Sequence, residues 1–228
     1  LYNFAVVVDD YEMQITHVIR GEDHVANTPK QIAIAQALGF PALEYAHLPL
    51  ILNPDRSKMS KRFNATAMNE YRAKGYLPEA MINFLALLGW HASPDQTFKN
   101  GEKIGDREVL SQEELFELFD ISRIQKGGAI FNQEKLAFFN QQYLKKLELE
   151  TIAELLRAGG FIGSAWQDDK LLVSAIGLVR ERMVVLSDFA GLADFVVAPI
   201  SYDPKILVWK KGSIEGAGEN LNRIHEAL

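Results

Sequence analysis

The segment ITHVIRGED, residues 15–23, decides the fold, because an apolar and β-branched run ends there in a glycine and charged side chains. Such a run is typical of a buried strand that delivers polar residues at its carboxyl end. A helix is predicted after it, capped by Asn27 or Thr28, with Pro29 in its first turn and Gly39 at its end. The apolar run HLPLIL, residues 47–52, predicts a second strand. Strand, helix and strand in this order predict a parallel crossover unit of a doubly wound sheet.

The remainder of the chain divides into one more predicted strand and a series of helices. The run FAVVV, residues 4–8, is aromatic and β-branched, ends at Asp9 and Asp10, and predicts another buried strand. After residue 62 the pattern changes to helices with short connections. We predict helices at 67–73, 78–88, 112–119, 133–139 and 169–186. A further helix is predicted to start at a capping box at 151–154, and a short helical stretch is predicted to follow residue 186 and end at 197. Residues 95–109, polar and with glycines, predict a loop or weak hairpin.

The apolar positions of three helices predict how they pack. The helix at 78–88 is apolar nearly all round and is expected to be central. The helix after the capping box at Ser111 is expected to bury its large apolar residues, which are Leu115, Phe116, Leu118 and Phe119. The helix at 169–186 carries a stripe at helical spacing formed by Leu172, Ala175, Ile176, Val179, Met183 and Leu186.

Composition limits the classes of function. With 228 residues and 48% hydrophobic content, the chain can build real cores, so disorder is not expected. It has no cysteine, and its five histidines are scattered without paired spacing, so no protein-bound metal is predicted. No apolar run approaches the ~20 residues that span a bilayer, which predicts a soluble protein without a membrane partner. A net charge of −6 argues against a surface that grips nucleic acid everywhere, but it allows a local basic track.

The loop KMSKR, residues 58–62, is the strongest chemical signal. It places three cations after the apolar run at 47–52 and the breaker NPDR at 53–56. In open α/β sheets ligands bind beyond the carboxyl ends of the strands, so this loop is placed to meet a phosphate. A basic loop that is merely solvated is the alternative.

Several ordered blocks make this chain resemble the bacterial-type glutamyl-tRNA synthetases, a family of class I aminoacyl-tRNA synthetases. The blocks are YNF at 2–4, ITHVIRGEDH at 15–24, TP at 28–29, HLPL at 47–50, KMSKR at 58–62, GYLPEA at 75–80, LGW at 88–90 and GGAIF at 127–131. The resemblance implies an α/β and then all-α chain in three parts. Residues 1–62 resemble the C-terminal part of a Rossmann-like catalytic domain, 63–147 a helical region that contacts the tRNA stem, and 148–228 the start of a helical anticodon-binding region.

The resemblance implies a two-step ligase. Glutamate attacks the α-phosphorus of ATP to give glutamyl-adenylate and pyrophosphate, and the acyl group then passes to the terminal adenosine of tRNA. The implied substrates and partners are therefore L-glutamate, tRNA(Glu) and ATP, with Mg²⁺ bound to the ATP. A cytoplasmic monomer is expected.

The implied ATP contacts gather around the basic loop. Lys58 and Lys61 are the catalytic candidates, because a flexible cation can stabilise the charge that accumulates during phosphoryl transfer. The rest of the loop, Met59, Ser60 and Arg62, is implied to bind ATP as well. Further implied contacts are the backbone of Leu50 and Ile51, for the adenine ring, and the side chain of Asp23. Ordinary core residues are the alternative for Leu50 and Ile51, and a solvated turn carboxylate is the alternative for Asp23.

The implied glutamate contacts are Tyr2, Arg20 and His24. An arginine at the end of a buried strand can give a carboxylate two parallel hydrogen bonds, which lysine cannot reproduce. A structural ion pair with Asp9 or Asp10 is the alternative role of Arg20.

Three features depart from the family pattern. The chain contains no His-x-Gly-His sequence, the phosphate-binding signature that relatives carry near their N-terminus together with a second arginine for glutamate. Val6 stands where some relatives have asparagine, and Phe63 stands where a basic residue is common. Because Leu1 begins directly at structured sequence without methionine, we expect an internal piece of a longer parent enzyme, unable to form adenylate alone.

Other functions stay open. A glutaminyl-specific relative shares the basic loop, although the helical tail argues against it, and a noncatalytic tRNA-binding fragment is also compatible with the chain. Six cations on the predicted helices are candidate phosphate contacts, with simple solvation as the alternative. They are Arg72, Lys74, Arg123, Lys126, Lys145 and Lys146.

Overall fold

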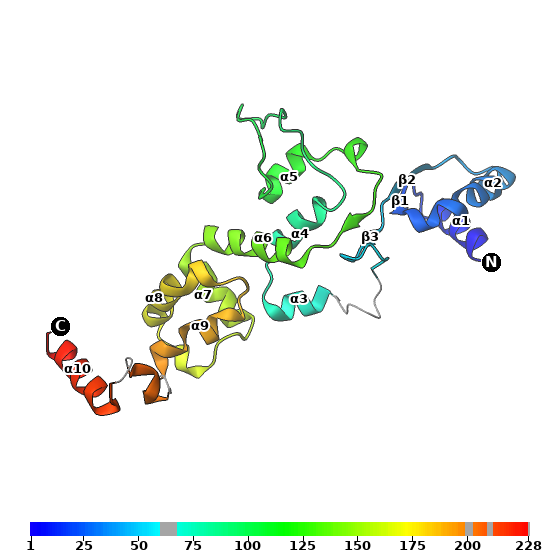
Figure 1. The fold of residues 1–228 in the computed structure, drawn as a ribbon. Coiled ribbons are helices and arrows are strands. Elements are labelled where there is room, and N and C mark those ends of the chain that lie inside the picture. The colour runs from blue at the N-terminus through cyan, green and yellow to red at the C-terminus, as the bar shows by residue number, and fades with distance from the viewer. Residues whose placement is uncertain (60–67, 199–202, 209–211, 228) are drawn as a thin grey trace.

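The computed structural model describes residues 1–59, 68–198, 203–208 and 212–227. The elements form an extended series in space (Figure 1), with the strands β1 and β2 near the N-terminus and the last helix at the opposite end. The α/β part precedes a mostly helical part, as predicted from the sequence, although the short strand β4 (Ala129–Ile130) lies within the latter.

A parallel crossover unit forms the N-terminal part. The strand β1 (His17–Gly21) leads through a 3₁₀ segment, η1 (Glu22–Asn27), into the helix α2 (Thr28–Leu38), and the chain returns in β2 (Glu44–Leu48). The two strands pair in parallel, with Arg20 beside His47. Gly39 closes α2 in the left-handed conformation at φ +70°, which glycine adopts without a steric penalty. The predicted crossover is confirmed.

The strand predicted at residues 4–8 is wrong. These residues lie in the helix α1 (Tyr2–Glu12), which contacts α2 and buries Val7. A short apolar run does not distinguish a strand from a helix, because both can bury it. Tyr11, near the end of α1, stacks on Phe40 with ring centroids 3.8 Å apart, so contact with the end of α2 favours the helix.

The apolar run at 47–52 forms two strands instead of one. β2 ends at Leu48, and β3 (Ile51–Leu52) leaves the first sheet to pair in parallel with β4 (Ala129–Ile130). Pro49 lies at the break, where its missing N–H would interrupt a continuous ladder. Gly128 permits the second pairing, since a Cβ there would lie 2.7 Å from Leu52 Cδ1. The run therefore links two small sheets.

The central helices are α3 (Met68–Lys74), α4 (Pro78–Ala86), α5 (Gln112–Leu118) and α6 (Gln133–Lys146), with a 3₁₀ turn η2 (Ile121–Arg123) after α5. The capping box at Ser111 is confirmed. An isolated antiparallel bridge between Thr97 and Lys103 confirms the weak hairpin.

The central position predicted for α4 is confirmed, because the helix contributes to three hydrophobic clusters: Ala80 to the first, Met81 and Phe84 to the second, and Ala86 to the third. Its outer face exposes Ile82 and Leu85.

The packing predicted for α5 is wrong in part. The helix α5 buries Leu115 and Leu118 but leaves Phe116 74% and Phe119 50% exposed. Phe116 lies on the outer side of this two-turn helix, and Phe119 follows the last helical residue in an extended conformation, outside the buried stripe.

The C-terminal part is entirely helical in its described residues. It comprises α7 (Leu149–Ala158), η3 (Ser164–Trp166), α8 (Asp169–Val179), η4 (Arg180–Arg182), α9 (Asp188–Val197), η5 (Pro204–Leu207) and α10 (Ile214–Ala227). No helix in the described ranges is long and apolar enough to cross a membrane.

Two boundaries predicted in this part are wrong. α7 begins at Leu149 with Glu148 before it, so Thr151 lies inside the helix and caps nothing. α8 ends at Val179, because η4 turns the chain before residue 186. The predicted apolar stripe is nevertheless buried throughout, including Met183 and Leu186. Burial therefore follows the apolar pattern even where the helix does not.

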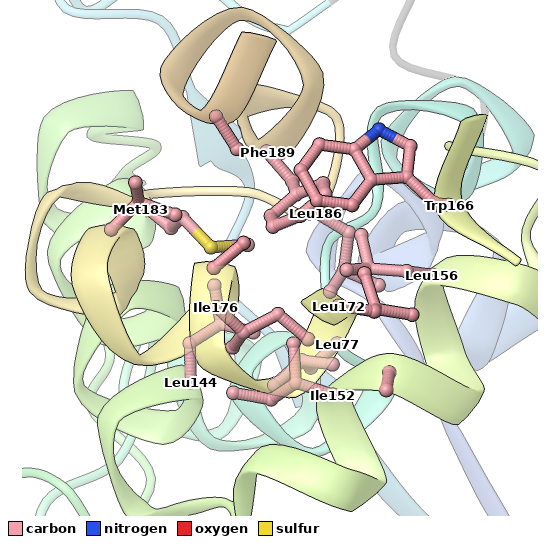
Figure 2. Close-up of a cluster of buried hydrophobic side chains, with 14 of the residues drawn as sticks. Leu77, Leu144, Ile152, Leu156, Trp166, Leu172, Ile176, Met183, Leu186 and Phe189 are labelled. Atoms are coloured by element: carbon pink, nitrogen blue, oxygen red, sulfur yellow. The ribbon is translucent and has the colours of Figure 1, made fainter. Parts of the chain in front are cut away.

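The largest core joins the C-terminal helices to the central ones (Figure 2). Trp166 and Phe189 meet edge to face with centroids 4.8 Å apart, among side chains of α7 and α8. Leu77, from the turn before α4, and Leu144, from α6, lie in the same cluster. The packing thus crosses the boundary predicted near residue 147.

Candidate ligand site at the strand ends

The carboxyl ends of β1 and β2 bring together the residues that the sequence singled out. Because the strands are parallel and in register, Arg20 and His47 occupy neighbouring positions at the same edge. η1 follows β1 at once and carries Asp23 and His24. The α2 N-terminus then places Thr28 beside the same edge.

Arg20 is half-buried and held by neutral partners. Its Nη2 donates a hydrogen bond to Thr28 Oγ1 at 2.8 Å, and its guanidinium carbon lies 5.5 Å from the centre of the Tyr45 ring. Its Nε is buried and has no hydrogen-bond partner among the described residues. In that same part of the chain Arg20 forms no ion pair with Asp9 or Asp10, so the structural alternative for it is not observed.

The positive charge of Arg20 nevertheless affects Asp10 in α1. Burial raises the pKa of Asp10, while the Arg20 charge opposes that rise and the neighbouring Asp9 adds to it. Burial also raises the pKa of Tyr45, again against the Arg20 charge. The guanidinium therefore lies near acidic groups without being neutralised by direct contact with one.

Tyr2 and His24 lie beside each other. Their ring centroids are 6.3 Å apart, with Tyr2 supplied by the first turn of α1 and His24 by η1. The His24 carbonyl accepts a hydrogen bond from Thr28 Oγ1 at 3.3 Å. Thr28 therefore links His24 to Arg20, and the predicted glutamate contacts form one neighbourhood.

Lys58 reaches the same edge from the basic loop. Its Nζ lies 3.1 Å from Asp23 Oδ2, in a pair exposed to solvent, and this hydrogen bond lowers the pKa of Asp23. Met59 N–H donates to the Ile51 carbonyl at 3.1 Å, so the start of the loop is anchored on β3. The predicted contacts Ser60, Lys61 and Arg62 lie outside the described residues.

The backbone of Leu50, predicted to receive the adenine ring, has partners in this structure. Its N–H donates to Glu22 Oε1 at 3.3 Å, and its carbonyl accepts from Ala129 N–H at 3.0 Å. A carboxylate oxygen can only accept a hydrogen bond. Glu22 therefore occupies the Leu50 N–H, which is the donor that a ring nitrogen of adenine would need.

A tight turn delivers Lys58. The Asp55 carboxylate accepts from the Ser57 N–H at 2.9 Å and the Ser57 hydroxyl at 2.6 Å, and these bonds lower the pKa of Asp55. Arg56 takes a positive φ of 65°, which closes the turn. From the sequence, residues 53–56 were predicted only to interrupt the preceding strand.

The six candidate phosphate contacts differ in their surroundings. Lys145 pairs with Glu181 at 3.0 Å, and Arg123 Nη1 donates to Gln96 Oε1 at 3.0 Å. The other four are exposed, which fits either phosphate contact or simple solvation; they are Arg72, Lys74, Lys126 and Lys146. Within the described ranges no three His, Asp or Glu side chains converge as metal ligands.

Three residues at the ends of the strands were not predicted from the sequence to have a function: Glu22, Thr28 and His47. They lie in the segments ITHVIRGEDH, TP and HLPL, beside the residues predicted to bind ligands. Only the strand register places His47 beside Arg20, and only the turn into α2 brings Thr28 to both.

Comparison with known proteins identifies relatives over most of the chain. The family described as tRNA synthetases class I (E and Q), catalytic domain, matches residues 1–138. Glutamate–tRNA ligase from Natranaerobius thermophilus is 48% identical over 82% of this chain, and glutamate–tRNA ligase 1 from Thermoanaerobacter sp. is 51% identical over 88%. These matches cover 37% and 40% of the two relatives, so the chain spans less than half of their length.

Two solved structures of glutamate–tRNA ligases also match most of this chain. A glutamate tRNA ligase from Elizabethkingia meningosepticum, in complex with its amino acid, matches 92% of this chain and 44% of its own, with a TM-score of 0.72 and 34% identity. Glutamate-tRNA synthetase from Elizabethkingia anophelis matches all of this chain and 50% of its own, also with a TM-score of 0.72, at 31% identity.

Proposed function

We propose that this chain, which belongs to the class I tRNA synthetases (E and Q), contributes part of the active site of a glutamate–tRNA ligase. Its substrates are L-glutamate, ATP with Mg²⁺, and tRNA(Glu). The parts proposed are residues 1–62 for the catalytic domain, 63–147 for tRNA stem contact and 148–228 for the start of the anticodon-binding region. The relatives named above support this assignment.

The observation that carries the proposal is Arg20 at the end of β1. Its guanidinium is engaged by the Thr28 hydroxyl and by no carboxylate of the described residues, so it retains charge for a carboxylate ligand. Asp23, in η1, follows Arg20, and Lys58, from the loop after β3, pairs with Asp23; a phosphate would bind there, beside that carboxylate. Tyr2 and His24 form a wall of the same neighbourhood.

Each group has a role in the two-step reaction. Arg20 holds glutamate while an oxygen of its α-carboxylate attacks the α-phosphorus and pyrophosphate leaves. Lys58 and Lys61 stabilise the charge on the phosphoryl oxygens and the leaving pyrophosphate, with Ser60 and Arg62 assisting. In the second step a ribose hydroxyl of the terminal adenosine attacks the glutamyl carbonyl, and AMP leaves.

ATP binding has two local requirements. Lys58 exchanges the Asp23 carboxylate for a phosphate oxygen, which costs little because both side chains are about half exposed in this pair. Glu22 leaves the Leu50 N–H so that adenine can accept that hydrogen bond. Because the chain spans less than half the length of these relatives, we assign the activity to a protein of the relatives' full length.

The test is tRNA charging by the full-length protein that contains this chain. We expect it to attach labelled glutamate to tRNA(Glu), and we expect Arg20→Lys to raise the KM for glutamate ~10- to 100-fold with the KM for ATP retained. Arg107→Lys is the matched control, since Arg107 pairs with Glu102 and Glu114 away from the strand ends.

Three results would contradict the proposal. Charging of glutamine instead of glutamate would favour the glutaminyl-type relative. Binding of tRNA without any charging would favour a noncatalytic module. Equal loss of affinity for glutamate and ATP in Arg20→Lys would remove the assigned role of Arg20.

A further inference from the structure

We propose that Thr28 is a positioning residue for glutamate recognition: its hydroxyl, oriented by His47, holds the Arg20 guanidinium toward the amino acid and away from the acidic end of α1. The inference rests on the proposed function, because it concerns the arginine assigned there to glutamate.

The hydroxyl of Thr28 is the centre of a converging network. Its Oγ1 lies 2.8 Å from Arg20 Nη2, 3.0 Å from His47 Nε2 and 3.3 Å from the carbonyl oxygen of His24. These partners come from β1, β2 and η1, so one oxygen joins three elements at the site edge.

The donors and acceptors available at Thr28 determine the direction of each hydrogen bond. A guanidinium can only donate, so Oγ1 accepts from Arg20. The His24 carbonyl can only accept, so the single hydroxyl proton goes to it if all three contacts are hydrogen bonds. His47 Nε2 must then carry a proton and donate to the second lone pair of Oγ1. This is the one assignment that satisfies all three contacts. It orients the hydroxyl so that one lone pair of Thr28 Oγ1 points at Arg20 Nη2.

The hydroxyl is not required by the helix it begins. Thr28 is the first residue of α2, while Asn27 occupies the N-cap position, and no side chain caps this helix. Threonine at a helix start commonly bonds a backbone N–H of the first turn, but here the hydroxyl faces the strand ends. The residue is therefore placed for Arg20 instead of for helix stability.

The alternative position for the guanidinium is the α1 end. Asp9 and Asp10 lie there, and the Arg20 charge already acts on Asp10 without contact. If Nη2 loses Thr28, the guanidinium can swing to these carboxylates and form the structural ion pair. That pair would neutralise the charge that glutamate needs, so Thr28 decides between a ligand-binding and a structural arginine.

The experiment uses the full-length protein and compares Thr28→Val with Thr28→Ser. Valine keeps the shape and removes the hydroxyl, so we expect the KM for glutamate to rise about tenfold, the size of one lost hydrogen bond to a charged group, with the KM for ATP unchanged. Serine restores the oxygen and should restore the glutamate KM. Thr151→Val, on the exposed face of α7, is the matched control.

A second variant tests the competing ion pair. Adding Asp10→Asn to Thr28→Val removes a carboxylate that would capture Arg20, and we expect the glutamate KM to recover at least partly. His47→Leu should also raise the glutamate KM, whereas His47→Gln retains a donor near Nε2 and should raise it less.

The outcomes separate this inference from the proposed function. If the wild-type protein does not charge tRNA with glutamate, the proposed function fails. If the wild type is active and Thr28→Val leaves the glutamate KM unchanged, or raises the KM values for glutamate and ATP equally, the positioning role of Thr28 is wrong. If Thr28→Val does not fold, a glutamate KM in His47→Leu equal to that of the wild type overturns the role.

Discussion

Tyr143 shows how one half-buried side chain makes stability depend on pH. Its hydroxyl contacts Asn83 Oδ1 at 3.1 Å and donates to the carbonyl oxygen of Leu110. Burial is the main reason that the pKa of Tyr143 is raised from 10.0 to about 12, with Glu79 and Glu114 adding to the rise. The neutral phenol is therefore the form that the folded protein favours.

The sign of the pH effect follows from that direction. Below pH 10 the tyrosine is neutral in both the folded and the unfolded chain, so its hydrogen bonds contribute fully. Between about pH 10 and 12 the unfolded chain loses the proton first, and stability falls. We expect Tyr143→Phe to cost about 1 kcal/mol of unfolding free energy at pH 7 and to flatten this alkaline decline. Urea unfolding at pH 7 and between pH 10 and 12 measures both, and parallel curves for wild type and variant would contradict it.

At the site, residue type alone indicated much of the chemistry. The sequence nominated Arg20, Asp23, Lys58, Tyr2 and His24, and the structure brings these five to adjoining segments. Their individual roles remain predictions. Sequence analysis could not find the Thr28 network, because a hydroxyl beside an arginine leaves no pattern in the chain.

The turn between α3 and α4 shows how one residue sets the approach of two elements. Gly75 has φ +81°, and an added Cβ would lie 2.5 Å from Leu186 Cβ and 2.9 Å from Leu186 N. The Gly75 carbonyl also accepts from Leu186 N–H at 3.2 Å. The segment before α9 therefore packs directly on this turn, and no larger residue fits there.

We expect Gly75→Ala to destabilise the chain by about 3 kcal/mol, combining the positive φ with the steric contact. Gly39→Ala is the matched control, because Gly39 also has φ +70° but an added Cβ meets nothing within 4 Å. It should cost only about 1 kcal/mol. Urea unfolding followed by the fluorescence of Trp166, in the adjoining core, compares them. Equal losses in the two variants would refute the steric part of this account.

Elements were predictable where local signals were unambiguous. α2 has both a proline in its first turn and a closing glycine, and α5 has a complete capping box, so both were located from the sequence. The run at 4–8 has neither signal; it lies in a helix that contacts α2 and buries only Val7. At Pro49 the chain changes sheets because β3 finds its partner in β4, ~80 residues later in sequence.

Asn140 connects the central and C-terminal helices. It is fully buried on α6, where its Oδ1 accepts from Leu77 N–H at 2.8 Å and its Nδ2 donates to the Val184 carbonyl at 2.6 Å. One side chain thus ties α6 to the entry of α4 and to the segment before α9. Both backbone groups depend on it for a partner.

We expect Asn140→Leu to cost about 3 kcal/mol, because it leaves the buried Leu77 N–H and the half-buried Val184 carbonyl without partners. Asn69→Leu, at an exposed position of α3, is the control and should change stability by less than about 0.5 kcal/mol. Limited proteolysis should cut the Asn140 variant faster near residues 183–187. Unchanged unfolding and cleavage would mean that the apolar core alone joins these helices.

From the sequence alone we predicted the family, the parallel crossover unit, most of the helices and a set of candidate site residues, because these follow from local periodicity, caps and residue type. The tertiary structure decided what depends on partners distant in sequence: the helical state of residues 2–12, the splitting of residues 47–52 between two sheets, and the meeting of Arg20, Thr28 and His47. The physical reason is that strand pairing, burial and hydrogen-bond satisfaction are set by which surfaces meet, and a linear pattern does not specify that meeting.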